Sequence, residues 1–154
     1  MNLLKNLWTA IGEIPDIETP YSILKKQAQY LNEVTKNLIE GQIKTEQISS
    51  SSIETWSPDA EDGLIRRDSS PSQSWSKNYF LIYSPILNWE YSLFEIAYDN
   101  INLYPVSFLK NGRYTYYIAR NENEFQEKLA EIFNSAETKR IITAIVSQSR
   151  AAER

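Results

Sequence analysis

A serine-rich segment at residues 49–76 is the feature that most constrains how this chain of 154 residues can fold. Ten of its 28 residues are serine, and it also contains Pro58, Gly63 and Pro71. A structureless stretch of this length is unusual inside a compact domain, where it is usually a disordered linker or a functional loop. We therefore predict one α+β domain over residues 1–154, with 49–76 as an inserted loop.

Two helices are predicted before the insertion. In the first, the large apolar residues follow the spacing of one helix face and end before Gly12; they are Leu3, Leu4, Leu7, Trp8 and Ile11. We expect a short amphipathic segment docked on the core. A membrane-surface helix is the alternative, and a single lysine gives it little attraction to anionic lipid.

The second helix has clear end signals, with Thr19 as N-cap, Pro20 at the first helical position and Gly41 as the left-handed residue after the last turn. Its apolar stripe is made of Ile23, Leu24, Ala28, Tyr30, Leu31, Val34, Thr35 and Leu38. Such a stripe can be a coiled-coil seam or a partner-binding face. We favour a helix that covers a sheet in its own domain, because about two and a half heptads are too few to argue for a coiled coil.

Strands are predicted after the insertion, over residues 78–84, 91–98, 103–109 and 113–119. Asn111-Gly112 is a strong hairpin signal between the last two, and Pro105 indicates an edge strand or a bulge. Residues 43–48 supply a possible fifth strand before the insertion. The predicted fold is a four- or five-stranded antiparallel meander covered by N-terminal and C-terminal helices.

Two further helices should close the chain. Asn121 and Glu124 have the spacing of a capping box, ahead of the apolar positions Phe125, Leu129, Ile132 and Phe133. Ser135 can cap a last helix that carries Ile141, Ile142, Ile145 and Val146.

Four sequence features together resemble small bacterial α+β proteins of an uncharacterised family. They are the helix from Pro20 to Gly41, the run from Tyr83 to Phe94, the step Leu103-Tyr104-Pro105-Val106 and the helix from Asn123 to Phe133. The resemblance implies a compact α+β fold and a bacterial source. It implies no activity, cofactor or catalytic residue.

The composition removes most enzyme classes. The chain has no cysteine and no histidine, so thiolate catalysis, the Ser-His-Asp triad and the usual zinc, copper and haem ligand sets cannot be built. Its formal net charge of −4 disfavours nucleic acid as a partner. No apolar run is long enough to span a bilayer, and we expect a cytoplasmic protein with no cofactor, no metal and no membrane partner.

Carboxylates are the remaining source of catalysis. The cluster Asp59 to Gly63 lacks the ligand spacing of a calcium loop, so we interpret it as a solvated loop. A hydrolase that uses carboxylates, alone or with a divalent metal, would need at least two of five acids to converge in one pocket. These acids are Glu90, Glu95, Asp99, Glu122 and Glu124.

A non-catalytic protein-binding module, such as an adaptor, inhibitor, immunity protein or regulator, is the predicted function. The chain has 10 tyrosines and 4 tryptophans, residue types that are favoured at interfaces. We predict an apolar partner site on the uncovered sheet face or on the inserted loop, with Trp56, Trp75, Tyr114 and Tyr116 as its candidate residues. The weaker alternatives are the carboxylate hydrolase and a homo-oligomeric structural subunit that associates through a sheet edge near Pro105.

Overall fold

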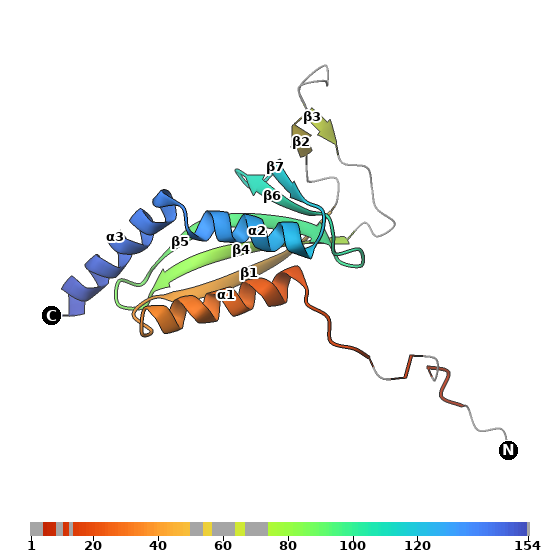
Figure 1. Cartoon of the computed structure of the whole chain (residues 1–154), viewed down its shortest axis with the longest axis horizontal. Helices are drawn as coiled ribbons and strands as arrows, with labels where there is room; N and C mark the ends of the chain where they lie inside the picture. Colours follow the sequence, from red (N-terminus) through yellow and green to blue (C-terminus); the bar gives the residue numbers. More distant parts are fainter. Residues whose placement is uncertain are drawn as a thin grey trace.

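A computed structural model describes residues 5–8, 11–12, 14–49, 54–56, 64–66 and 74–153 of the chain. The helices and strands in this part are α1 (Pro20–Val34), β1 (Glu40–Ser49), β2 (Glu54–Trp56), β3 (Leu64–Arg66), β4 (Ser74–Ser84), β5 (Trp89–Asp99), β6 (Val106–Lys110), β7 (Tyr114–Ala119), α2 (Glu122–Phe133) and α3 (Ala136–Glu153). Figure 1 shows their arrangement. One helix precedes the strands and two follow them, which confirms the predicted α+β class.

The strands hydrogen-bond in the order β1-β4-β5-β6-β7-β2-β3. The five longest form an antiparallel meander in chain order, interrupted only by the insertion between β1 and β4. The prediction of four or five strands is therefore confirmed. Inside the insertion, β2 pairs parallel with β7 and antiparallel with β3, two short strands that the serine-rich composition gave no reason to expect.

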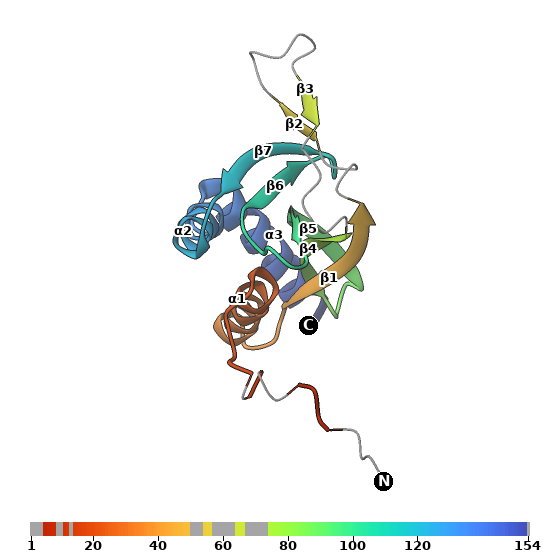
Figure 2. The ribbon, with the colours of Figure 1, turned by 90° about the vertical axis from the view of Figure 1, so that its right-hand side faces the viewer.

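All three helices pack on one face of the sheet, as Figure 2 shows. The main core joins α1 and α2 to the sheet through the buried Leu24, Phe80, Phe108 and Phe125. A second cluster joins α3 to the strands through Ile82 and the buried isoleucines of the helix. The predicted cover of N-terminal and C-terminal helices is confirmed, and it leaves the opposite face of the sheet without a helix.

Most of the predicted helix caps and the predicted hairpin turn are present in the structure. Thr19 and Ser22 exchange side-chain to backbone hydrogen bonds in a capping box, with Pro20 at the first helical position. Asn111 and Gly112 both adopt positive φ, as the Asn-Gly hairpin turn requires. The oxygen of Ser135 accepts a hydrogen bond from the N–H of Thr138 at the start of α3.

Two end predictions need correction. The predicted capping box of α2 is half confirmed, because Asn121 Oδ1 accepts from the N–H of Glu124 at 2.9 Å. The Glu124 carboxylate accepts at 2.7 Å from the backbone N–H of Arg120, one residue before the N–H of Asn121 that a standard capping box would use. Pro105 lies directly before β6, because a residue without an N–H cannot donate to the ladder. β6 lies between β5 and β7, so the expected sheet edge near Pro105 is wrong. The irregularity in this pairing lies between Phe108 and Leu109, where Tyr116 of β7 is the extra residue, and not at Pro105.

The prediction that the helix starting at Pro20 ends at Gly41 is also wrong. α1 ends at Val34, the chain turns at Lys36 and Asn37 with positive φ, and Gly41 belongs to β1. A Cβ at Gly41 would lie 2.7 Å from the Cα of Ala28 on α1. Glycine is needed at position 41 because the backbones of the helix and the strand approach each other closely. The N–H of Gly41 also donates to the side-chain oxygen of Asn32 on α1.

The predicted docked segment at residues 3–11 is not found either. Residues 5–8 and 11–12 form no helix, and Leu7, Trp8 and Ile11 are exposed; Leu3 and Leu4 lie outside the described residues. The chain before Thr19 leads away from the helices and the sheet instead of packing on the core (Figure 1).

We expect Gly41→Ala to lower the free energy of unfolding by about 1–3 kcal/mol, because the added methyl group would force α1 away from β1. Urea unfolding followed by circular dichroism would measure the change. Gln42→Ala, on the neighbouring exposed position, is the control and should change stability by less than about 0.5 kcal/mol. Equal stability of the two variants would contradict the close contact.

A second prediction concerns Tyr98, whose buried hydroxyl donates to the Asn78 oxygen at 2.8 Å. Burial raises the pKa of Tyr98 to about 12. Between about pH 10 and 12 the unfolded chain loses this proton first, so stability should fall by up to about 1.4 kcal/mol per pH unit from this group. Tyr98→Phe should be about 1–3 kcal/mol less stable at pH 7 and lack this part of the alkaline fall.

Tyr83→Phe is the control for this pH series, because the Tyr83 hydroxyl bonds Asn88 at the surface. Its unfolding free energy should follow the wild-type pH dependence. An alkaline slope that is the same in Tyr98→Phe and in the wild type would show that Tyr98 does not carry the effect.

Candidate functional site

The apolar stripe of α1 is wider than the surface that the sheet covers. Ile23, Leu24 and Ala28 are buried in the core. Closer to the C-terminal end of the helix, Tyr30 is 55% exposed and Val34 is 80% exposed. The helix therefore turns part of its apolar face towards an open space.

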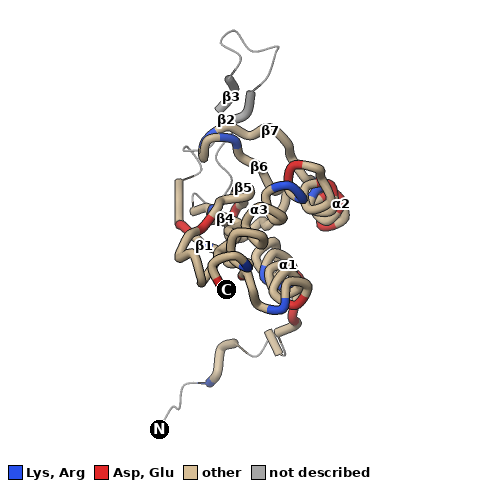
Figure 3. Tube along the Cα trace, turned by 90° about the vertical axis from the view of Figure 1, so that its left-hand side faces the viewer, with Lys and Arg blue, Asp and Glu red and all other residues tan. Residues whose placement is uncertain are grey.

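That space is an apolar groove between α1 and the α2–α3 pair, with the sheet as its floor. Its volume is about 180 Å³. The groove is lined by Gln27, Tyr30, Leu31, Val34, Phe80, Ile82, Leu93, Phe133 and Ile142. None of these side chains carries a charge, although acidic and basic positions are interspersed along α1 and α2 (Figure 3).

Two phenylalanines, Phe80 and Phe133, line the groove, and a third, Phe94, packs against both. Phe80 and Phe94 stack with ring centroids 5.3 Å apart and planes 11° from parallel. Phe133, the last residue of α2, lies 5.2 Å from Phe80 and 5.8 Å from Phe94, centroid to centroid. Aromatic pairs at these separations stabilise one another, so the two rings that line the groove belong to a packed three-ring cluster.

The four predicted partner-binding residues do not form this groove. Trp75 is only 3% exposed and packs against Ala97 and Leu109 on the sheet face without helices, so its ring is not offered to a partner. The side chain of Trp56 lies outside the described residues. Tyr114 is half-buried beside Arg113, and Tyr116 is exposed and lines a second hollow next to α2 and α3.

Among the described residues, Trp75 and Leu81 on the sheet face without helices are buried and do not form the apolar patch that the sequence suggested. Strand alternation places Trp75, Lys77 and Leu81 on this face, and all three are buried. Lys77 donates to the carbonyl of Gly112 at 2.9 Å, and its Nζ lies 4.0 Å from Glu95 Oε2. This polar contact holds the hairpin turn against β4.

The carboxylates that a hydrolase would need are dispersed. Glu90 is exposed on β5, Glu95 faces Lys77, and Glu122 and Glu124 lie in the first turn of α2. The buried Asp99 accepts backbone N–H groups from the following turn, at 2.7 and 2.9 Å. None of the five acids lines the groove or any of three further hollows found on the described surface.

Two negative observations apply to the described residues alone. No group of three acidic side chains among them is close enough to hold a metal ion together. Within the same residues, every helix is too short or too polar to cross a membrane.

Comparison of the chain with protein-family models, with curated proteins and with solved structures finds no match. The groove is therefore described from its own geometry. The sequence analysis placed Tyr30 and Val34 in a stripe that it weighed as a partner-binding face, but it favoured burial against the sheet, and it gave Phe133 only as an apolar helix position. The available signal was the stripe on α1, whose width Tyr30 and Val34 increase beyond what one packed face requires.

We expect the two ends of this stripe to differ in their effect on stability. Leu24→Ala should lower the free energy of unfolding by about 2–5 kcal/mol, because it leaves a cavity in the core. Val34→Ala should change it by less than about 0.5 kcal/mol, because that side chain is exposed. Urea unfolding of both variants would test this, and a large loss in Val34→Ala would show that the groove is closed in solution.

Proposed function

We propose that this chain is a non-catalytic protein-binding module, and that its groove takes up apolar side chains from a segment of another protein. The observation that carries the proposal is an uncharged groove that Phe80 and Phe133 line, with the exposed apolar residues Tyr30 and Val34 at its rim. Exposed apolar surface next to a groove is costly in water unless a partner covers it.

The size of the groove favours a peptide over a small molecule. Its volume of about 180 Å³ is below the roughly 300–1,000 Å³ typical of small-molecule sites. A hollow of this size suits one or two anchoring side chains, while the rest of the segment lies along the rim. An amphipathic helix that places residues i, i+3 or i+4 and i+7 in a groove binds in this manner.

Tyr30 and Val34 on the rim support the same mode of binding. Tyrosine is enriched among residues that contribute most to interfaces, because it buries a large rigid ring and keeps a polar end in water. Val34 adds apolar area one turn further along α1 at little entropic cost, because a branched side chain has few rotamers to lose.

Peptide display on the immobilised full chain would test the proposal. We expect selected peptides to carry apolar residues at helical spacing. Fluorescence anisotropy with a selected peptide should show at least a roughly tenfold weaker affinity for Val34→Asp, because a carboxylate enters an apolar contact, a loss of about 1.4 kcal/mol.

Gln29→Asp is the matched control for this experiment. It introduces the same charge on the same helix, at an exposed position beside a different hollow between α1 and β1. Its affinity should stay within about threefold of wild type, since the charge lies away from the groove. Selection of no peptide, or equal losses in the two variants, would overturn the proposed function.

A further inference from the structure

The chain carries an exposed apolar segment of its own before α1. We call it the arm and define it by its described residues, 5–8, 11–12 and 14–17. Its large apolar side chains are all exposed, from 48% to 84%; they are Leu7, Trp8, Ile11, Ile14 and Ile17. None of them belongs to any of the three core clusters. A segment of this composition is typical of a docking element.

The chemistry of the arm matches that of the groove. Leu7, Trp8 and Ile11 have the spacing of one helix face in the stretch that ends before Gly12, so a helix formed on docking would present them together. Residues 6–12 carry no charge, and the groove lining carries none. Docking would therefore bury apolar area on both surfaces without removing an ion from water, which is the costly step in burying polar segments.

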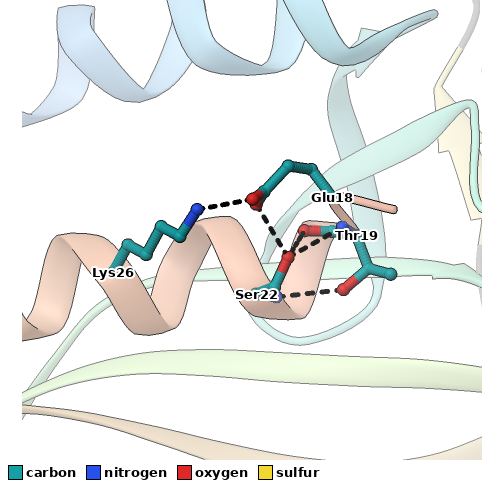
Figure 4. A network of polar contacts seen from close by, with 4 residues as sticks. All are labelled: Glu18, Thr19, Ser22 and Lys26. Atoms are coloured by element: carbon teal, nitrogen blue, oxygen red, sulfur yellow. Dashed lines mark hydrogen bonds and ion pairs between the residues drawn. The ribbon is translucent and has the colours of Figure 1, made fainter. Parts of the chain in front are cut away.

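The attachment of the arm directs it away from the groove of its own chain. The carboxylate of Glu18 accepts a hydrogen bond from Ser22 and pairs with Lys26, and Thr19 and Ser22 complete the capping box (Figure 4). These contacts hold the chain extended as it enters α1, with Thr19 at φ −112° and ψ 162°. The arm leads away from the body of the molecule (Figure 1).

The position of the groove along α1 also separates it from the arm of the same chain. The α1 residues that line it begin at Gln27 and end at Val34, towards the far end of the helix from Thr19. To enter this groove the arm would have to reverse its direction at Glu18 and run back past the capped first turn. The groove of another copy imposes no such reversal.

We propose that the arm of one copy occupies the groove of a second copy, and that reciprocal exchange of two arms forms a two-fold symmetric homodimer. The inference rests on the proposed function of the groove and names its occupant. Each copy contributes one arm and one groove, so the exchange closes on itself and leaves neither exposed.

Sedimentation equilibrium of the full chain tests this exchange. We expect a mass of about twice 17.9 kDa. The double variant Leu7→Asp/Trp8→Asp removes the arm contact, and Val34→Asp removes the groove contact; both should sediment as monomers. Ile101→Asp is the control, because it places the same charge at another exposed apolar residue, in the turn after β5, and it should remain a dimer.

Mixing the two monomeric variants gives a complementation test. The double variant keeps an intact groove and Val34→Asp keeps an intact arm, so an equimolar mixture should form heterodimers with one arm–groove contact. A labelled peptide of residues 1–18 should bind the double variant and not Val34→Asp. Dimerisation that survives in either variant, or a mixture that stays monomeric, would overturn the inference.

Failure of this inference can be told from failure of the proposed function. A monomeric wild-type chain whose groove still binds display-selected peptides would overturn arm exchange and leave the peptide-binding function standing. A monomeric chain that binds phosphatidylglycerol vesicles through Trp8 would assign the arm to a lipid surface and overturn the exchange. A groove that binds neither selected peptides nor residues 1–18 would overturn both.

Discussion

The close packing of α1 on β1 is the constraint on which the rest of the structure depends. Gly41 lets the strand backbone approach Ala28, and this contact fixes the height and the direction of α1 above the sheet. Leu24 and Phe80 then meet in the main core. Because α1 lies over β1 and β4 while α2 packs near β7, the two helices stand apart and the groove opens between them.

The two faces of the sheet are stabilised by different kinds of interaction. On the helix face, stacked phenylalanines and buried aliphatic side chains supply apolar burial, which is the main source of stability. On the opposite face, Lys77 donates a hydrogen bond to the carbonyl of Gly112, which links the hairpin turn to β4. A buried lysine is tolerated there because a carbonyl and the nearby carboxylate of Glu95 replace the water it loses.

The groove and the arm share one physical origin, which is apolar surface that the domain itself leaves uncovered. Val34 and Tyr30 belong to a helical stripe that extends past the sheet, and Trp8 belongs to a segment that extends past the helix. Two of the carboxylates considered for catalysis have structural roles instead. Asp99 and Glu124 accept hydrogen bonds from backbone N–H groups, at a turn and at a helix start respectively. The described surface therefore exposes apolar area at the groove and on the arm, whereas these two acids have structural partners.

The sequence by itself determined the elements whose causes are local. Thr19 and Pro20 begin a helix, and Asn111-Gly112 makes a hairpin, because the necessary hydrogen bonds and positive φ angles involve residues within a few positions. Tertiary structure alone decided that Gly41 faces Ala28 and that Trp75 is buried. It likewise decided that only part of the α1 stripe is covered, because each of these outcomes depends on contacts between segments that the sequence pattern does not pair.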